Sequence, residues 1–583
     1  MAKRVSWSQR ISGLQNRWHA RRAARAHPPT GLLIQPEPRT IGRVSTGQQL
    51  LAGKVLLAGH LVEIDDRSVW DMPAPSCRFA EALQGFAWMD DLAAVGDLAA
   101  RDTAQDWTFE WIERYGAGKG PGWTPELAGR RLIRWINHAV FLCGGQAPES
   151  IKVFHRSMAR QTLFLARRWR AAPAGLARIE ALTGLIDASL SLKGMEAHAD
   201  AAAEGLAAEC VARIGADGGV ATRSPEDLME IFTLLNWSAL TLAGNGRIVR
   251  PEIASAIERI TPVLRALRHA DGGLARFHGG GRGHEGRLDQ ALATAGVRAA
   301  ATTGLAMGFA RLRGGRTSLI MDAATPPQGD ASLNAHASTL AIEVTSGRRP
   351  MIVNCGSGAE FGASWHKAGR ATPSHSVLGL DGYSSSRLTG DGGELRLAGG
   401  PHETHANLIG DTGFSGIIAG HDGFMATHGL GYVRRIEMAR DGRMIHGEET
   451  LAAVSNAEKK KFDAAMARER GIPFSLRFHL HPDVDASLDL GGTAVSLALK
   501  SGEIWVLRYE GRYSLEIEPS VFLEKGLLEP RSAKQVVLSG AASDYSTHIR
   551  WSLAKAQDTP VGLRDLVRDG PGDTDYDISR VFT

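Results

Sequence analysis

The residues most able to do chemistry lie between positions 334 and 388. In this stretch polar side chains are set among short apolar runs and turn residues, a pattern typical of strands and tight turns. The polar residues are Asn334, His336, Asn354, His366, Arg370 and His375. Histidine can serve as an acid, a base or a metal ligand near neutral pH. Because polar groups on neighbouring strands can converge on one rigid pocket, we expect this stretch to be the functional centre.

The elements that must position these groups follow two different periods. From about residue 79 to 313, apolar residues recur at spacings of three and four, and glycine-rich turns separate the segments, which predicts an array of helical hairpins. Ser224 to Asp227 predict a helix start, with a capping serine, a proline at the first position and acids in the first turn. From about residue 318 the period is two, which predicts stacked antiparallel sheets.

The chain is too long for one hydrophobic core, so we predict an α+β multidomain protein. The predicted parts are a basic N-terminal arm and lead-in over residues 1–70, a helical domain over 71–315, an antiparallel β domain over 316–557 and a tail over 558–583. The tail is rich in Asp, Gly and Pro, which predicts an extended or docking segment.

Composition narrows the classes of function. A net charge of +4 is small for 583 residues and gives no case for nucleic acid, although a local basic groove for an acidic substrate stays open. No run of eighteen apolar residues exists, so no segment is predicted to span a membrane. The four cysteines are widely scattered and are predicted to be buried thiols.

The N-terminal segment is basic and carries two tryptophans, Trp7 and Trp18. Its basic residues are Lys3, Arg4, Arg10, Arg17, Arg21, Arg22 and Arg25. No apolar region typical of a signal peptide follows them, so no cleavable export signal is predicted. Two alternatives remain: a solvated basic arm or helix, or an interfacial helix that contacts anionic lipid and gives peripheral membrane contact.

Several local motifs make the chain resemble the heparinase II/III-like polysaccharide lyases. They are Leu83-Gln-Gly-Phe-Ala-Trp88-Met-Asp-Asp-Leu, Asp271-Gly-Gly-Leu-Ala-Arg-Phe, Asn334-Ala-His-Ala-Ser, Ala371-Thr-Pro-Ser-His-Ser and Pro473-Phe-Ser-Leu-Arg-Phe-His-Leu-His-Pro. The resemblance spans about residues 70 to 555. It implies an N-terminal incomplete (α/α) toroid followed by a C-terminal antiparallel β-sandwich. It also implies β-elimination of an acidic, uronic-acid-containing polysaccharide in the cleft between these domains.

The resemblance implies roles for the residues of the functional centre. His336 matches the second histidine of the family's H-x-H-x-D pattern, which binds a structural zinc in some relatives, and Asn334 replaces the catalytic first histidine. His375 matches the histidine of an A-H-N-T-like segment, and Asn354 stands where some relatives have a metal-binding Asp. The implied metal ligands are therefore His336, Asn354 and His375. Because an asparagine oxygen is a poor zinc ligand, a zinc site, a metal-free pocket and purely structural histidines all remain open. No other cofactor is predicted.

Elimination also needs groups that neutralise the uronate carboxylate and groups that move protons. The catalytic candidates are Asn334, His336, His366 and His375. Arg223 and Arg370 are the candidate carboxylate partners, and Trp88 is a candidate sugar platform, with surface arginines and a core tryptophan as the alternatives. His366 is either a base or acid, or an exposed loop histidine. His278 lies in a glycine-rich segment that could cap a cleft.

The chain departs from the family pattern in its helical domain. The tyrosine expected after the Asp217-Gly218-Gly219 turn is absent, and so is the Asn-His pair expected within residues 184–194. Three functions therefore stay open: a polysaccharide lyase, a catalytically degenerate carbohydrate-binding or cell-envelope-associated protein, and a glycan hydrolase with paired carboxylates. The resemblance implies the cell envelope or periplasm as the location, and the lack of an ordinary export signal keeps the cytoplasm as the alternative. The sequence gives no oligomeric state.

Overall fold

A computed structural model describes residues 7–34, 37–64, 68–298, 304–390, 395–469 and 471–556. The predicted tail over 558–583 and the basic residues Lys3 and Arg4 lie outside these described residues. The chain divides into two compact units. The helical unit holds the described residues up to 216, together with 229–261 and 289–297, and the β unit holds 217–228, 262–288 and the described residues from 298 onward.

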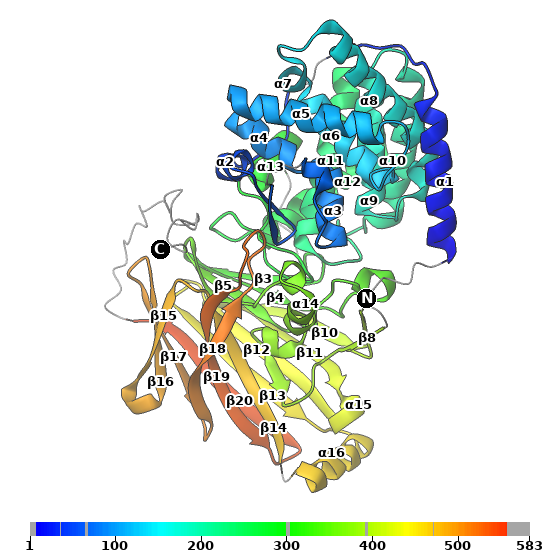
Figure 1. The fold of residues 1–583 in the computed structure, drawn as a ribbon. Coiled ribbons are helices and arrows are strands. Elements are labelled where there is room, and N and C mark those ends of the chain that lie inside the picture. Colours follow the sequence, from blue (N-terminus) through cyan, green and yellow to red (C-terminus); the bar gives the residue numbers. More distant parts are fainter. Residues whose placement is uncertain are drawn as a thin grey trace. The chain divides into compact units, whose positions relative to one another are not determined.

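The first half of the chain is helical, as the period of three and four predicts (Figure 1). The helices are α1 (Trp7–Ala24), α2 (Val44–Leu51), α3 (Cys77–Gln84), α4 (Trp88–Val95), α5 (Leu98–Tyr115), α6 (Pro125–Asn137), α7 (Ala139–Cys143), α8 (Pro148–Arg168), α9 (Leu176–Ser191), α10 (Ala199–Arg213), α11 (Pro225–Gly244), α12 (Pro251–Leu267) and α13 (Arg287–Ala295). A short hairpin, β1 (Lys54–Leu57) and β2 (His60–Glu63), lies between α2 and α3 in the chain. Helix α11 begins as predicted, because the Ser224 hydroxyl accepts a hydrogen bond from the Asp227 N–H at 3.3 Å.

Large aromatic side chains fill the core of the helical unit. Trp111 and Trp135 have no exposed surface, and their rings meet edge to face with centroids 5.6 Å apart. Helices α6 and α9 approach closely through two glycines. A Cβ atom at Gly129 would lie 2.5 Å from the Glu180 carbonyl oxygen, and one at Gly184 would lie 2.5 Å from the Gly129 carbonyl oxygen. Only glycine therefore permits this helix contact.

The β unit consists mainly of two eight-stranded sheets whose paired strands all run antiparallel. The first sheet has the order β10 (Thr404–Gly410), β11 (Phe414–Phe424), β12 (Leu430–Ala439), β13 (Met444–Ala452), β20 (Ser546–Lys555), β17 (Ile504–Glu510), β16 (Ala494–Leu499) and β15 (Val484–Asp489). The second has the order β18 (Ser514–Phe522), β19 (Arg531–Ala542), β14 (Ile472–Leu480), β6 (Arg349–Val353), β5 (Ile342–Ser346), β4 (Thr317–Asp322) and β3 (Phe309–Gly314), with β7 (Leu378–Leu380) also paired to β14. A small separate pair joins β8 (Arg387–Thr389) to β9 (Arg396–Ala398).

The two large sheets stack face to face, as the alternating pattern predicts (Figure 1). Phe478 on β14 and Trp551 on β20 meet across the sheets with ring centroids 4.9 Å apart. The buried Arg434 on β12 donates from Nε to both oxygens of Glu449 on β13, at 2.9 and 3.0 Å. Its Nη1 reaches the carbonyl oxygens of Leu340 at 2.6 Å and Ser376 at 3.0 Å. A buried ion pair therefore ties the first sheet to loops beside the second.

The stretch from residue 354 to 377 differs from the predicted strands and tight turns. It contains a 3-10 helix at Gly358–Glu360, helix α14 (Ala363–Gly369) and a second 3-10 helix at Thr372–Ser374. Helices α15 (Met425–His428) and α16 (Asn456–Glu469) also interrupt the β unit. Residues 354–377 connect β6 to β7, so their polar groups come from a connection between strands and not from the strands themselves.

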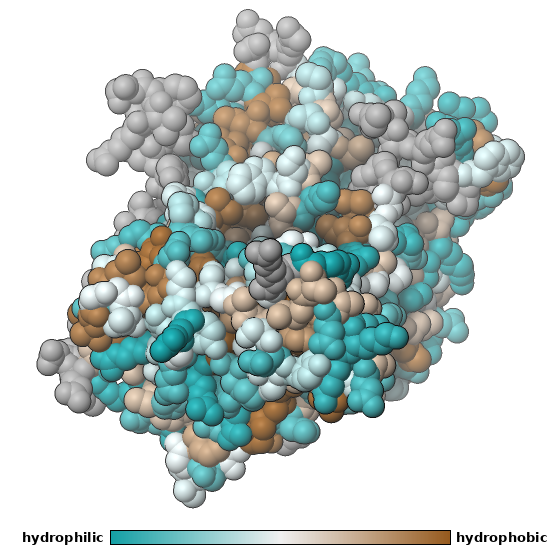
Figure 2. Space-filling model, turned by 90° about the horizontal axis from the view of Figure 1, so that it is seen from below, coloured by the Kyte–Doolittle hydropathy of each residue, from teal (hydrophilic) through white to brown (hydrophobic). Residues whose placement is uncertain are grey.

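The surface seen in Figure 2 is mainly hydrophilic, and its hydrophobic residues lie in scattered patches. Among the described residues, no helix combines the length and the apolar character that crossing a membrane requires.

Candidate functional site

The predicted histidines meet in a buried polar cluster of the β unit. His336 lies in the connection between β4 and β5, and His375 follows the 3-10 helix Thr372–Ser374. His278 comes from the segment 262–288, and Asp322 ends β4. All four side chains are buried. The structure therefore brings His336 and His375 together, as the sequence predicts, and adds two residues that the sequence did not place in the site.

Hydrogen bonds fix the tautomers of the two predicted histidines. His375 Nδ1 lies 2.8 Å from the Ala371 carbonyl oxygen, which only accepts, so Nδ1 carries the proton. His375 Nε2 is then a lone pair, and it accepts from His336 Nδ1 at 3.0 Å. His336 Nε2 is consequently also a lone pair, and it is buried with no hydrogen-bond partner among the described residues. We call this chain of hydrogen bonds, from His336 through His375 to the Ala371 carbonyl, the relay. Its outer end, His336 Nε2, is an unprotonated nitrogen.

Both histidines of the relay are held neutral. Burial lowers the pKa of His375 to about 4, although the hydrogen bond to the Ala371 carbonyl opposes this shift. Burial also lowers the pKa of His336 well below its ordinary value, and the neighbouring His375 and His278 add to the effect. A neutral imidazole with a free lone pair can accept a proton, which is the one chemical property this relay offers.

Asp322 is the anionic centre of the cluster. Its Oδ2 accepts from the Ser338 hydroxyl at 2.8 Å and lies 3.2 Å from His278 Nε2, without the alignment of a hydrogen bond. His278 Nδ1 accepts from the backbone N–H of His336 at 3.3 Å, so Nε2 carries the His278 proton. Burial raises the pKa of Asp322, but Arg223 and His278 outweigh burial and hold that pKa below its usual range. His278 is thus a buried partner of Asp322 and not part of an exposed cap.

Arg223, predicted to bind a substrate carboxylate, is fully occupied inside the β unit. Its Nε donates to the Met307 carbonyl at 3.1 Å. Its Nη1 donates to the Ala324 and Thr325 carbonyls at 3.2 and 3.0 Å. Its Nη2 donates to the Gly308 carbonyl at 3.1 Å and to Asp322 Oδ1 at 2.5 Å. A guanidinium has five N–H donors, so none is left for a carboxylate of a substrate.

Arg370 and Asn354 are also committed to the protein. Arg370 is buried and donates to the carbonyls of Ala335, Leu395 and Ser332, each at 2.8 Å. Burial lowers the pKa of Arg370 to about 10. The Asn354 amide oxygen accepts from the Ser376 N–H at 3.0 Å, and its Nδ2 lies 3.4 Å from Glu343 Oε1. Arg370 and Asn354 therefore hold the backbone of the loops around the site, which is a structural role.

The described residues do not fit the zinc site that the resemblance implies. His336 Nδ1 and His375 Nε2 are engaged with each other, and the Asn354 oxygen is engaged with a backbone N–H. Within the described part of the chain, no group of three His, Cys, Asp or Glu side chains is arranged to hold a metal ion. Ser338, in the place of the family's carboxylate, donates to Asp322. The donor set therefore lacks the third strong ligand that zinc requires.

The remaining predicted residues lie apart from this relay or at its edge. Trp88 has no exposed surface in the core of the helical unit, where its ring packs on Phe86 with centroids 4.7 Å apart, so no sugar ring can stack on it. Asn334 is exposed. His366 is half-buried on α14, near enough to His336 to contribute to lowering the pKa of His336. Of the four catalytic candidates, His336 and His375 are hydrogen-bonded to each other.

The β unit contains a second buried ionic cluster, which the sequence did not predict. Glu343 on β5 accepts from the Arg276 backbone N–H and contacts His269 Nε2, both at 3.1 Å. The Arg276 guanidinium lies 3.9 Å over the Phe522 ring and donates to the Asn354 carbonyl at 3.1 Å. The signal for Glu343 and Asp322 was an acid within or ending an apolar strand, since such an acid must be paired when the strand is buried.

Comparison with known proteins places this geometry in a family. The family described as Heparinase II/III-like, C-terminal, matches residues 297–552. FtsZ-localized protein C of Caulobacter vibrioides (strain NA1000 / CB15N) is 32% identical over 538 residues, which cover 91% of both chains. A crystal structure of heparinase III matches with a TM-score of 0.68 at 13% identity, covering 94% of this chain and 89% of that one. Heparan sulfate lyase HepC from Pedobacter heparinus, as a mutant, matches with a TM-score of 0.56 at 13% identity, covering 94% and 88%.

These matches confirm the predicted fold class, an N-terminal incomplete (α/α) toroid followed by a C-terminal antiparallel β-sandwich. They also confirm the resemblance on which the site residues were chosen. The chain belongs to the heparinase II/III-like family.

Proposed function

We propose that this chain is a catalytically degenerate, cell-envelope-associated protein built on a polysaccharide-lyase scaffold. The observation that carries the proposal is the saturation of Arg223, whose five N–H donors all bind acceptors of the β unit. β-Elimination removes a proton next to a carboxylate, and a cationic or hydrogen-bonding group must offset the charge that develops there. Arg370 is buried and donates three of its five N–H groups to backbone carbonyls, so we expect neither predicted arginine to supply this group.

The helical unit supplies a feature that suits an envelope-associated protein. Trp7, Ile11, Leu14 and Trp18 are all exposed, with 79% of Trp7 and 56% of Trp18 open to solvent. Their spacings of four, three and four place them on one face of α1. A helix with an exposed apolar stripe and arginines beside it is typical of a membrane-interface helix. We propose that this face of α1 contacts the surface of an anionic membrane.

The opposite face of α1 is attached to the helical unit. Asn16, Ala20 and Ala23 are buried. Arg168 on α8 donates from Nε to the Asn16 side chain at 2.7 Å and from Nη1 to that of Gln15 at 3.0 Å. This attachment leaves the stripe facing outward, so membrane contact does not require α1 to leave α8.

The name of one relative suggests where such a protein works. FtsZ-localized protein C shares 32% identity with this chain over nearly its whole length. We propose that this chain, too, associates with FtsZ, and that its membrane-contacting helix acts in the same place. Binding of the full chain to purified FtsZ is the expected result in a pull-down, and an FtsZ-free eluate under conditions in which the chain stays folded contradicts this part of the proposal.

The loss of lyase chemistry is tested with a panel of uronate polymers. The full chain is mixed with each polymer, and the ultraviolet absorbance of the unsaturated product is followed. We expect no increase on any polymer, at a protein concentration at which a family lyase used as the positive control gives a full signal. An increase that disappears in His336→Gln overturns the proposal.

A retained lyase is the second candidate, and one observation favours it. The lone pair of His336 Nε2 has no partner among the described residues, and the relay through His375 to the Ala371 carbonyl would stabilise the proton that this nitrogen gains. In this candidate His336 is the base. The same polymer panel decides between the two candidates, because only the lyase predicts an absorbance increase that depends on both His336 and His375.

A further inference from the structure

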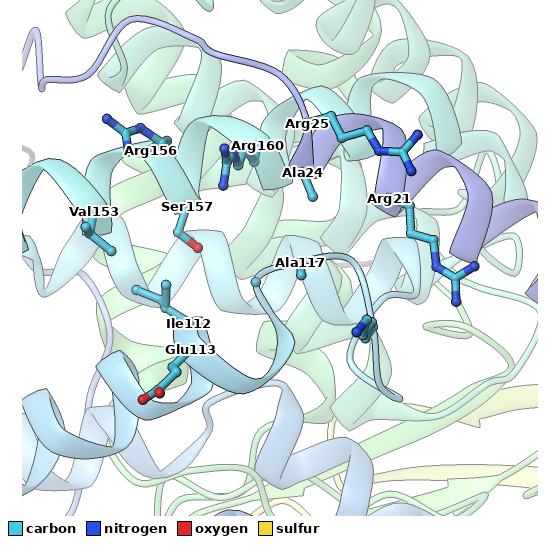
Figure 3. A pocket seen from close by; sticks show the side chains of 12 residues that line it. Arg21, Ala24, Arg25, Ile112, Glu113, Ala117, Val153, Arg156, Ser157 and Arg160 are labelled. Atoms are coloured by element: carbon cyan, nitrogen blue, oxygen red, sulfur yellow. The ribbon is translucent and has the colours of Figure 1, made fainter.

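A cavity of about 600 Å³ lies in the helical unit among α1, α5 and α8. Helix α1 contributes Arg21, the turn after it contributes Arg25, and α8 contributes Arg156 and Arg160 (Figure 3). Lys119 adds a fifth cation, and Glu113 is the single carboxylate of the lining. The cavity wall therefore carries five positively charged side chains and one negatively charged side chain.

The cations of this cavity are not neutralised by the protein. None of the five forms an ion pair within 4.0 Å with any residue that the structure describes. Arg160 uses only Nε, which donates to the Ala26 carbonyl at 3.2 Å. Burial lowers the pKa of Arg160, and the nearby Arg156 lowers it further, so the two guanidiniums repel each other. An anion placed between them would remove this repulsion.

The cavity also offers a neutral donor. Ser157 is buried, and its side chain points into the cavity (Figure 3). Its oxygen accepts from Gln161 Nε2 at 3.5 Å, which leaves the hydroxyl proton free to donate. Several guanidinium groups and a hydroxyl together form a set of donors. This set matches the several oxygens of a phosphate better than the two oxygens of a carboxylate.

The apolar stripe of α1 leads along the helix to Arg21, which lines the basic cavity. The stripe runs through Trp7, Ile11, Leu14 and Trp18, and a further step of three leads to Arg21, whereas Arg25 lies in the turn just after the end of α1. The stripe and Arg21 lie on one side of α1. A ligand that contacts the whole face must be apolar at one end and anionic at the other, which is the chemistry of an anionic phospholipid and not of a soluble acidic peptide.

We propose that the cavity lined by Arg21, Arg25, Lys119, Arg156 and Arg160 binds the phosphate headgroup of an anionic phospholipid. This inference rests on the proposed contact of α1 with the membrane and adds a defined headgroup site to it. The stripe would insert into the interface, and the cavity would hold one headgroup beside it. The cavity thereby makes membrane contact dependent on a phosphate and not on negative charge alone.

The test compares two pairs of charge-removing substitutions in the full chain. Arg25→Gln with Arg156→Gln removes one cavity cation from each wall. Arg10→Gln with Arg17→Gln removes the same charge from exposed positions of α1 that do not line the cavity. Sedimentation with vesicles of phosphatidylcholine, with and without phosphatidylglycerol, gives the affinity. Each cation near an anionic surface adds about fivefold to binding, so the second pair measures the loss expected from charge alone.

We expect the cavity pair to lose at least tenfold more affinity for phosphatidylglycerol vesicles than the α1 pair. We also expect soluble glycerol phosphate, at matched ionic strength, to displace the wild-type chain and the α1 pair but not the cavity pair. Equal losses in the two pairs, or no displacement by glycerol phosphate, overturn the headgroup site. Stronger displacement by polyglutamate than by glycerol phosphate also overturns it, because it would assign the cavity to an acidic peptide.

A third variant separates this inference from the proposal on which it rests. Trp7→Ser with Trp18→Ser removes most of the stripe and leaves the cavity intact. We expect this variant to lose vesicle binding and to keep glycerol phosphate binding in isothermal titration calorimetry. Vesicle binding that equals wild type contradicts the membrane-contacting helix, whereas glycerol phosphate binding lost only in the cavity pair still supports a phosphate site.

Discussion

Two groups of arginines in this molecule are used in opposite ways. In the β unit, Arg223 and Arg370 are buried, and their donors bind carbonyl oxygens and, for Arg223, the Asp322 carboxylate. In the helical unit, Arg25 and Arg156 line an open cavity and form no ion pair with the described residues. The sequence favoured the first group as ligand-binding residues, and the geometry favours the second.

The difference shows that the type of a residue does not decide whether it binds a ligand. An arginine becomes a ligand group only when the protein leaves some of its five donors without acceptors. Arg223 has been absorbed into the fold by the carboxylate at the end of β4, whereas the cavity residues have one carboxylate among five cations. Four predictions test this contrast, from the largest effect to the smallest.

The largest effect is expected for Arg223→Gln. This substitution leaves Asp322 buried without its main cationic partner, and breaking a buried pair typically costs about 3–5 kcal/mol of unfolding free energy. Urea unfolding followed by far-ultraviolet circular dichroism measures the loss. The double variant Arg223→Gln with Asp322→Asn is expected to recover part of it, because no unpaired charge remains. A stability change below about 1 kcal/mol in the single variant would show that Arg223 is not absorbed into the fold as described.

The second effect concerns acid. The folded pKa of His375 is lowered to about 4 from 6.5, so below pH 6.5 the unfolded chain binds a proton that the folded chain refuses. Stability is therefore expected to fall as pH drops from 6.5 towards 4, by up to about 3 kcal/mol for this residue. His375→Asn should make the pH dependence of the urea midpoint shallower, and His405→Asn, at an exposed position, should not. Identical slopes in all three proteins would contradict the neutral relay.

The third effect concerns the apolar stripe of α1. Removing two exposed tryptophans with Trp7→Ser and Trp18→Ser is expected to weaken binding to anionic vesicles roughly 30-fold, equivalent to about 2 kcal/mol of lost apolar burial. The matched control is Val211→Ser with Ile248→Ser, which removes two exposed apolar residues elsewhere in the helical unit. A control that weakens binding as much as the stripe variant would assign the effect to overall hydrophobicity and not to the helix face.

The smallest effect is expected for Arg156→Gln. Since Arg156 has no ion pair with the described residues, its removal should change the unfolding free energy by less than about 0.5 kcal/mol. The same urea experiment that detects the Arg223 loss provides the measurement. A large loss of stability here would erase the contrast between the two groups of arginines.

Much of the fold could be predicted from the sequence, because periodicity reports directly which faces are buried. The helices over 127–136 and 179–192 and the strands at 351–354 and 475–481 follow their patterns closely. The connection at 354–377 was predicted less well. Its short helices are held by side-chain contacts, such as that of Arg370 with distant carbonyls, and such contacts leave no period in the sequence.

The site could be predicted only in part. His336 and His375 were found because their local motifs survive. Asp322 and His278 were missed as partners. His278 is 58 residues before His336, and Asp322 is 16 residues before Ser338, and only the folded β unit brings these segments together. The saturation of Arg223 could not be predicted at all, since its acceptors are mostly backbone carbonyls, and every residue type carries one.

The buried pair Arg434 and Glu449 has an evolutionary consequence. The two residues are directly opposite each other on β12 and β13, and Arg434 also holds the Ser376 carbonyl beside His375. Losing one partner strands a charge in the sandwich, whereas replacing both with apolar residues can be tolerated. Related proteins should therefore either keep both Arg434 and Glu449 or replace both. Replacing both would also remove the hydrogen bond from Arg434 to the Ser376 carbonyl, which holds the turn next to His375.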